Sequence, residues 1–275
     1  METVDTVTRA RALFDAAPRP LGFVPTMGAL HDGHLELIRR ARLRCASVGA
    51  SIFVNPLQFG PNEDFARYPR DEERDRVKLS QAGADMVFVP NGTTMYPVDF
   101  STFVEVGPMG HLFEGAHRPD HFRGVTTVIA KLLNIARPDV LFLGQKDAQQ
   151  AAVVCKMIAE LNYPVEIEIV PTVRERDGLA MSSRNRYLDA TQRAQAPTLY
   201  RALEATRDAL ERGVSKSEAI AEGTAALSAS AKLDYLDLVD ADSFVPLERL
   251  RPSAFIVAAA RFGGTRLIDN LWITE

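Results

Sequence analysis

Hydrophobic and polar positions along the first two-thirds of the chain predict strands alternating with helices. Short apolar runs, which are typical of strands buried in a parallel sheet, alternate with segments whose apolar residues recur at helical spacing. The predicted strands are residues 21–25, 51–54, 85–89, 100–106, 140–143 and 165–170. The predicted helices are residues 34–45, 71–82 and 125–136, and a further helix that Asp147 can cap and that runs to about Leu161.

This alternation predicts βαβ units, and therefore a largely parallel α/β sheet with helices on both faces. Ligands bind such sheets beyond the carboxyl ends of the strands. Polar motifs follow three of the predicted strands: "TMGALHDGH" after the first, "NPLQF" after the second and "GQKD" after the fifth. We therefore expect these three motifs to carry the chemistry.

The pattern changes near Pro171. Helices are predicted at residues 190–212, with a break or restart at Pro197, and at residues 216–228. Strands follow at residues 232–240, 253–262 and 265–273, the last two joined at Gly263-Gly264, and Asp177-Gly178 predicts a tight turn. The sequence thus predicts a larger domain over residues 1–172 and a smaller α+β domain over residues 173–275.

Composition and charge argue against several classes of protein and site. The formal net charge of −4 argues against a sequence-independent nucleic-acid binder, which is usually basic. Cys45 and Cys155 are too few for a structural zinc cluster, and we expect them to be buried, reduced thiols. Residues 1–20 do not resemble a signal peptide, and no stretch approaches the roughly 20 apolar residues of a membrane helix. We expect a cytoplasmic protein that does not bind a membrane.

Two histidines follow the first predicted strand. His31 and His34 lie three positions apart at the start of a helix, with Gly28 and Gly33 beside them. Backbone N–H groups at a helix N-terminus attract phosphate, and imidazoles there would add donors for the same anion. A zinc site of the metalloprotease kind needs histidines four apart with a glutamate between them, which this stretch lacks. The pattern favours an anion site over two unrelated surface histidines.

Two more motifs supply cations. Lys146 follows the fifth predicted strand, where a point charge suits phosphate oxygens, although most loop lysines are only solvated. In "MSSRN", Ser182 and Ser183 precede Arg184, and hydroxyl and guanidinium groups are good partners for diphosphate. No G-x-S-x-G elbow is present, so we reject a serine hydrolase.

Together the motifs resemble a known family. "PTMGALHDGH" is similar to the HxGH signature of the nucleotidyltransferase superfamily, and "FVNPLQF", "HFRGV", "GQKDAQQ" and "AMSSRN" follow in the order seen in pantoate–β-alanine ligases. The resemblance covers the chain from about Leu21 to the C-terminal strands. It implies that ATP, pantoate and β-alanine give pantothenate, AMP and diphosphate through a pantoyl-adenylate. It also implies a Rossmann-like N-terminal domain, a smaller C-terminal domain, a homodimer, and Mg²⁺ arriving with ATP.

The resemblance also implies roles for individual residues. The catalytic set is His31, His34, Lys146 and Arg184, with His34 as proton donor or, on physical grounds, hydrogen-bond donor to the reacting phosphate. The residues implied to bind ATP are Met27, Gly28, Ala29, Leu30, His31, Asp32, Gly33, His34, Gly144, Gln145, Lys146, Asp147, Val173, Met181, Ser182, Ser183 and Arg184. Gln58 and Gln150 are implied to bind pantoate, and Gln58 also β-alanine, while no protein ligand to a metal is nominated. Many relatives carry Glu at the position of Gln145.

The remaining expectations concern the surroundings of these residues. Met27 and Phe59 could wall the apolar part of pantoate, and Arg118 and His121 lie near the active site by analogy. Residues 60–71 form either a lid that excludes water from the acyl-adenylate or a static surface loop.

Two other functions stay open. A different HxGH nucleotidyltransferase would share the histidines but lack the pair Gln58 and Gln150. A non-catalytic ATP-binding protein would not need His34 or Lys146.

Overall fold

A computed structural model describes residues 1–61 and 63–273 of the 275-residue chain. The described chain separates by its internal contacts into two compact units. The first comprises Met1–Gly144 and Val153–Pro171; the second comprises Gln145–Ala152 and the chain from Thr172 onward. The segment Gln145–Ala152 therefore groups with the second unit, although it lies in the chain between two pieces of the first.

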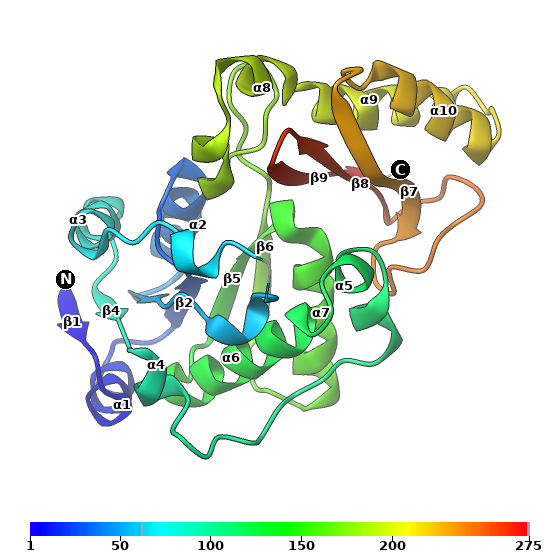
Figure 1. The fold of residues 1–275 in the computed structure, drawn as a ribbon. Helices are drawn as coiled ribbons and strands as arrows, with labels where there is room; N and C mark the ends of the chain where they lie inside the picture. The colour runs from blue at the N-terminus through cyan, green and yellow to red at the C-terminus, as the bar shows by residue number, and fades with distance from the viewer. Residues whose placement is uncertain (62, 274–275) are drawn as a thin grey trace. The chain divides into compact units, whose positions relative to one another are not determined.

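The first unit is built on a six-stranded parallel sheet of order β1-β4-β3-β2-β5-β6 (Figure 1). Its strands are β1 (Glu2–Val4), β2 (Leu21–Thr26), β3 (Ser47–Ile52), β4 (Met86–Phe88), β5 (Val140–Gly144) and β6 (Glu166–Val170). The predicted parallel α/β fold is confirmed, and the order places β2, with its histidine motif, next to the centre of the sheet.

Helices accompany this sheet. They are α1 (Val7–Asp15), α2 (Asp32–Arg44), α3 (Glu72–Ala82), α4 (Gly92–Met95), α5 (Glu114–His117), α6 (His121–Ala136) and α7 (Ala148–Glu160), with short 3-10 turns η1 (Pro56–Gln58), η2 (Phe65–Arg67) and η3 (Pro108–His111). The start of α7, up to Ala152, groups with the second unit. Contacts pair α2 with α3 and α1 with α6. Leu37, Ile38 and Ala41 form the apolar stripe of α2 and join Val24 and Val48 of the sheet in one buried cluster, which packs α2 against the sheet.

The predicted strand at residues 100–106 is wrong, because no strand forms there. The backbone of Val104 bonds to side chains of α6 instead: its N–H donates to Thr127 Oγ1 at 3.0 Å, and its carbonyl accepts from Thr126 Oγ1 at 2.6 Å. The ring of Phe103 lies under the guanidinium of Arg123, 3.9 Å from the centroid. The alternation of apolar and polar residues that predicted a strand at residues 100–106 therefore belongs to a loop that packs on α6. The sixth strand is β1 at the sheet edge, which is too short to show a periodic pattern.

Strand β3 begins four residues before the predicted start. Its first four residues, Ser47 to Ala50, are mainly small, so this part lacks the apolar run that predicts a strand. The strand is nevertheless buried throughout. At Gly49 an added Cβ would lie 2.6 Å from the ring of Phe14, so the small residue admits an aromatic side chain. Close packing, rather than hydrophobicity of the strand itself, stabilises this element.

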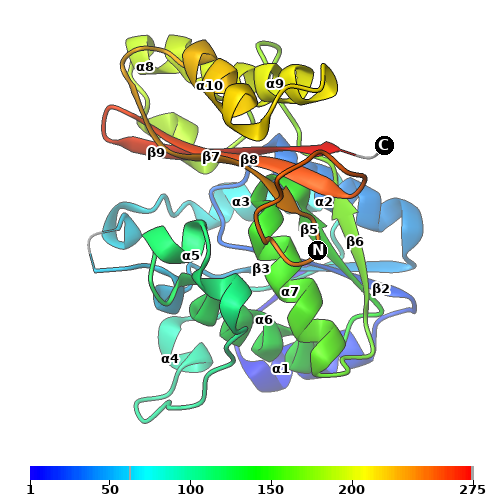
Figure 2. The ribbon, with the colours of Figure 1, turned by 90° about the vertical axis from the view of Figure 1, so that its right-hand side faces the viewer.

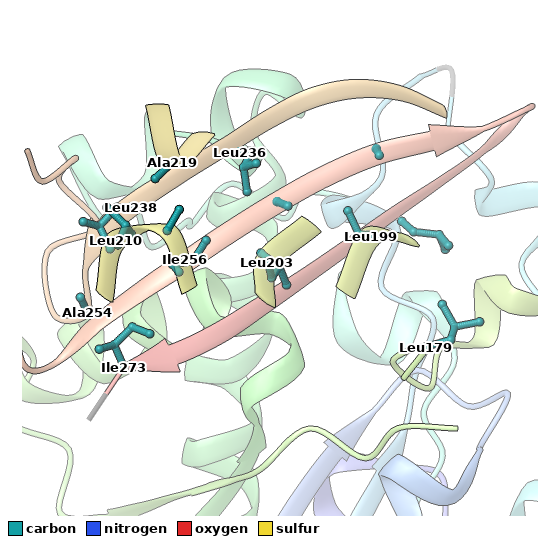
Figure 3. Close-up of a cluster of buried hydrophobic side chains, with 14 of the residues drawn as sticks. Leu179, Leu199, Leu203, Leu210, Ala219, Leu236, Leu238, Ala254, Ile256 and Ile273 are labelled. Carbon is teal, nitrogen blue, oxygen red and sulfur yellow. The ribbon is translucent and has the colours of Figure 1, made fainter. Parts of the chain in front are cut away.

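The second unit contains an antiparallel sheet of order β7-β8-β9. Its elements after α7 are η5 (Ser183–Tyr187), α8 (Ala190–Gln195), α9 (Thr198–Glu211), α10 (Lys216–Ala226), β7 (Ala231–Asp240), β8 (Ala254–Phe262) and β9 (Thr265–Ile273), and η4 (Gln145–Asp147) precedes α7. Figure 2 shows α9 and α10 on one face of the sheet. Between these layers lies a buried apolar cluster that includes Leu203, Leu210, Leu238 and Ile256 (Figure 3). The predicted α+β character and the restart at Pro197 are confirmed.

Within residues 1–61 and 63–273, no helix combines the length and the apolar character needed to cross a bilayer.

Candidate active site

A buried carboxylate shapes the turn between β2 and α2. Gly28 has φ +76° and Ala29 has φ +52°, both in the left-handed region that favours glycine. Asp75 of α3, 2% exposed, accepts the N–H of Ala29 at 2.7 Å and that of Leu30 at 2.9 Å. A Cβ on Gly28 would lie 2.9 Å from Asp75 Oδ2. Glycine is therefore required here for the contact with Asp75 as well as for the turn.

Asp75 also limits which donors remain for a ligand. Because the amides of Ala29 and Leu30 already bind its carboxylate, these two amides are occupied in this conformation. The N–H groups of Asp32 and Gly33 belong to the first turn of α2, whose donors have no acceptor inside the helix. The positive end of the helix dipole lies at the same place. An anion at this turn would therefore meet the helix start rather than the preceding loop.

The two histidines lie together at this helix start. His31 is the N-cap of α2, His34 is in its first turn, and the ring centroids are 4.1 Å apart. The backbone N–H of His31 points to Nδ1 of His34 at 3.4 Å. A ring nitrogen that accepts carries no proton, so this contact assigns the proton of a neutral His34 to Nε2. His34 then presents an N–H donor.

Gln58 is fixed by a second set of contacts in the first unit. It ends η1 and is 7% exposed. Asn55 Nδ2 donates to Gln58 Oε1 at 3.0 Å, which orients the amide so that its nitrogen points to Met27 Sδ, 3.1 Å away. The structure thus brings together two of the predicted site residues, Gln58 and Met27. The amide nitrogen of Gln58 has a second hydrogen that can serve a substrate oxygen.

Helix α6 supports η1 through the same asparagine and through its own backbone. Asn55 Nδ2 also donates to the carbonyl of Gly124 at 3.0 Å, and the hydroxyl of Tyr96 donates to Asn55 Oδ1 at 2.7 Å. A Cβ on Gly124 would come within 2.3 Å of the carbonyl oxygen of Leu57. The backbone of α6 therefore touches the backbone of η1, and this contact sets the position of Gln58.

Arg118 and His121 hold the next part of the chain. Arg118 donates twice to Glu63, at 2.9 and 2.6 Å, and once to the carbonyl of Gln58 at 3.2 Å. His121 Nδ1 donates to the same carbonyl at 2.8 Å, and its Nε2 lies 3.1 Å from Arg118. Burial, and then the charge of Arg118, lowers the pKa of His121 to about 4. His121 is therefore neutral near pH 7, with its proton on Nδ1.

The loop of residues 60–71 carries this ion pair. Arg118 lowers the pKa of the Glu63 carboxyl, although burial opposes that shift. Phe59 packs against Phe65 and Tyr68, with ring centroids 5.4 and 5.7 Å apart. The described part of the loop, which excludes residue 62, is thus anchored at both a charged and an aromatic contact. Whether it acts as a lid stays a prediction.

In the second unit, Lys146 lies in η4 directly after β5. Its ammonium is 3.1 Å from Asp147 Oδ1. Asn270 of β9 donates from Nδ2 to the carbonyls of Gln145 and Lys146, both at 2.9 Å. Gln150 follows in the first turns of α7 and is half-buried. A Cβ on Gly144 would meet nothing within 4 Å among the described residues, so packing does not require glycine there.

The Ser-Ser-Arg segment follows a small hairpin. Arg174 and Ala180 form an isolated antiparallel bridge around the predicted turn at Gly178, which has φ +92°. The N–H of Met181 donates to the carbonyl of Val173 at 3.0 Å. Ser182 then accepts the N–H of Arg184 at 3.3 Å and so caps η5. The predicted residues Val173 and Met181 to Arg184 therefore lie next to one another.

Several residues that shape the site are absent from the sequence-based prediction. They are Asp75, Asn55, Tyr96, Gly124, Arg174, Asp269 and Asn270. Asp75 lies in the polar run "EERDRVKLS", where nothing distinguishes a buried carboxylate from exposed ones. Asp269 and Asn270 could have been identified from the sequence, because two adjacent polar residues in the middle of the apolar strand "TRLIDNLWI" indicate buried hydrogen-bonding groups.

Among the described residues, no group of three or more His, Cys, Asp or Glu side chains could hold a metal ion. The predicted site residues with charge are mainly cations and imidazoles, which suit phosphate rather than a protein-bound metal.

Comparison with known proteins gives a consistent result. A family model described as pantoate-beta-alanine ligase matches residues 1–272. The pantothenate synthetase of Chloroflexus aurantiacus is 50% identical over 279 aligned residues, covering 100% of this chain and 98% of that protein. That of Acidiphilium cryptum is 52% identical, covering 94% of each.

Two solved structures that match this chain are of the same family as the sequence relatives. The crystal structure of pantothenate synthetase from Thermus thermophilus matches with a TM-score of 0.95 and 50% identity, covering 100% of both chains. The pantoate-beta-alanine ligase of Francisella tularensis, complexed with beta-gamma ATP and beta-alanine, matches with a TM-score of 0.82 and 33% identity, covering 99% of this chain and 97% of that one. From the full-length family match and these identities, the chain belongs to the pantoate–β-alanine ligase family.

Proposed function

We propose that the protein condenses pantoate with β-alanine, using ATP, and releases pantothenate, AMP and diphosphate. Membership of the family supports the reaction, and the Francisella tularensis relative binds beta-gamma ATP and beta-alanine. The observation in this chain that carries the proposal is the pair His31 and His34 at the first turn of α2, with the donor of His34 assigned to Nε2. That arrangement is suited to an anion.

The first step joins two anions. A carboxylate oxygen of pantoate attacks the α-phosphorus of ATP, the bond to the β-phosphate oxygen breaks, and diphosphate leaves with the electron pair. Negative charge grows on the phosphate oxygens, so the step needs oriented donors and cations rather than a protein nucleophile. His34 Nε2–H, the ammonium of Lys146 and the guanidinium of Arg184 are the groups that we assign to this charge.

The second step forms the amide. The uncharged amine of β-alanine attacks the acyl carbon of the pantoyl-adenylate, the bond from that carbon to the phosphate oxygen breaks, AMP leaves with the electron pair, and the amine proton passes to the solvent. We assign no general base to this proton. The step competes with hydrolysis of the adenylate, which gives the loop of residues 60–71 its proposed role as a lid.

Pantoate needs neutral partners. We assign its hydroxyl and carboxylate oxygens to the amides of Gln58 and Gln150, because an amide donates hydrogen bonds without neutralising the attacking carboxylate. The contact of Asn55 with Gln58 Oε1 supports this assignment, since it turns the donating end of the amide toward Met27.

Three further points belong to the proposal: the first two rest on the resemblance, and the third rests on the composition of the sequence. Mg²⁺ enters with ATP, where it would neutralise phosphate charge and keep most of its ligands from phosphate and water. The protein acts as a homodimer, and it works in the cytoplasm.

One assay tests the reaction. The purified protein is incubated with Mg²⁺-ATP, pantoate and β-alanine, and AMP is measured. AMP that requires both acids supports the ligase; ATP binding without any turnover would instead support a non-catalytic nucleotide-binding protein.

A further inference from the structure

The clearest polar feature of the second unit that the reaction does not use is the pair Asp269-Asn270 in β9. These side chains are 5% and 2% exposed, in a strand whose other buried residues are mostly apolar. Burying polar groups is unfavourable unless they are hydrogen-bonded, so their partners show what the pair does.

Asn270 bonds to the lysine segment three times. Its Nδ2 uses both hydrogens, one to the carbonyl of Gln145 and one to that of Lys146, each at 2.9 Å. Its Oδ1 accepts from the side-chain nitrogen of Gln145 at 3.3 Å. An asparagine that gives both donors to two consecutive carbonyls fixes the orientation of the peptide unit between them. The backbone at Lys146, which carries the ammonium side chain, is therefore held by β9.

Asp269 holds the other nucleotide segment. It accepts two hydrogen bonds from Arg174, at 2.6 and 2.9 Å. Arg174 also donates to the carbonyl of Gly178 at 3.1 Å, and its guanidinium lies 3.8 Å from the centroid of the Tyr200 ring. A planar guanidinium bound on its edge and its face has little freedom. The hairpin that leads into Met181 is therefore fixed to the same strand.

Alternation along the strand explains how two neighbours reach two segments. Successive side chains of a strand point to opposite faces. Asp269 shares its face with Leu267 and Ile273, which belong to the apolar cluster under α9 and α10. Asn270 lies on the opposite face, where it meets η4. The two neighbouring residues thus tie η4 and the hairpin before "MSSRN" to the same strand, β9.

We propose that Asn270 is a positioning residue for Lys146: it holds the backbone of Gln145 and Lys146 so that the ammonium meets the phosphates of ATP, and Asp269 does the same for the Ser-Ser-Arg segment through Arg174. The inference rests on the proposed function, in that it takes Lys146 to act on ATP. The grouping of Gln145–Ala152 with the second unit agrees with it.

The test is a double-mutant cycle of Asn270→Ala and Lys146→Ala, read out as the dissociation constant of Mg²⁺-ATP by calorimetry. Two neutral hydrogen bonds and the orientation that they fix predict a loss of affinity of about 10-fold for Asn270→Ala alone. In the Lys146→Ala background, the same change should weaken ATP binding by less than about 2-fold, because the group that it positions is gone. Independent, multiplicative effects would overturn the proposal.

Kinetic constants provide a second readout. Asn270→Ala should raise the KM for ATP and lower kcat, while the KM for β-alanine stays unchanged; a general loss of structure would change all three. Asn134→Ala is the matched control, because Asn134 Nδ2 also donates to a backbone carbonyl, that of Ala130 at 2.9 Å. It should leave every constant unchanged.

Folding is checked by circular dichroism. If Asn270→Ala does not fold, Asn270→Asp replaces it: it keeps the size of the side chain and loses both donors, so wild-type affinity for ATP in this variant would contradict the proposal. A wild-type protein that binds ATP but forms no AMP would refute the proposed function only, since the binding cycle still decides the role of Asn270.

Discussion

At the scale of the residue, two histidines of the first unit differ in which ring nitrogen carries the proton of the neutral ring. His121 must stay neutral, because its Nδ1–H binds the carbonyl of Gln58 while its Nε2 faces the guanidinium of Arg118. His34 lies at the start of α2, where its Nδ1 faces the N–H of His31, so a neutral ring carries its proton on Nε2. The first supports the backbone of Gln58, which we propose to bind pantoate, and the second is the residue that we propose to act on the phosphates of ATP.

Replacing His121 should change how stability depends on pH. The pKa of His121 falls from 6.5 to about 4 on folding, so between these values the unfolded chain binds a proton that the folded protein excludes. Stability from this group is therefore present above pH 6.5 and lost as pH falls toward 4, by about 3 kcal/mol in all. His121→Asn, which can still donate to Gln58, should flatten the pH dependence of the urea unfolding free energy between pH 4 and 6.5. A pH dependence identical to that of the wild type would contradict the assignment.

Replacing His34 should affect the chemical step. Removing one oriented donor to a developing phosphate charge costs about 10²- to 10³-fold in kcat, so His34→Ala should lower the rate of AMP formation by that factor in a protein that still folds. His111→Ala is the control, since His111 is an exposed residue of η3. A His34→Ala protein with a near-normal rate would remove His34 from the mechanism.

Residue types at the site could be predicted from the sequence only where the motif itself carries chemistry. His31, His34 and Lys146 lie near glycines just after predicted strands, and this pattern can be recognised in the sequence alone. Asp75 and Asn55 act through partners 45 and 69 positions away, Leu30 and Gly124. Long-range pairing of this kind depends on the packing of helices, which a single sequence does not reveal.

At the scale of the element, the contact between α6 and η1 controls the position of Gln58. The predicted start of α6 at residue 125 missed its first turn, which contains His121 and Gly124. Those residues contribute little to an apolar stripe, yet they make the contacts with η1. The spacing of apolar residues identifies α6 because its apolar face is buried. It does not reveal the first turn of α6, whose contacts with η1 are made to backbone carbonyls.

Gly124→Ala should therefore disturb pantoate binding. Its Cβ would meet the carbonyl oxygen of Leu57 at 2.3 Å, so η1 or α6 must shift, at a cost of about 1–3 kcal/mol in unfolding free energy. We expect a raised KM for pantoate. Gly92→Ala is the matched control, because a Cβ there meets nothing within 4 Å among the described residues. An unchanged KM for pantoate in Gly124→Ala would show that η1 does not depend on this contact.

At the scale of the whole molecule, the sequence predicts the parallel α/β unit and the smaller unit, because both follow from periodicity and turn residues. The start of β3 was not predicted, because its residues are small rather than strongly apolar. The segment around Phe103 has the residue pattern of a strand but forms a loop that packs on α6. The sequence also does not predict that Gln145–Ala152 groups with the second unit, because η4 contacts β9, more than a hundred positions later in the chain.

The proposed roles fall on both units: His34 and Gln58 belong to the first, and Lys146 and Arg184 to the second. The central claim is that they serve a stepwise reaction through an acyl-adenylate. Exchange of labelled diphosphate into ATP measures the first step alone. We predict exchange with Mg²⁺-ATP and pantoate in the absence of β-alanine, and none without pantoate. Exchange that requires β-alanine, or that proceeds without pantoate, would contradict the account.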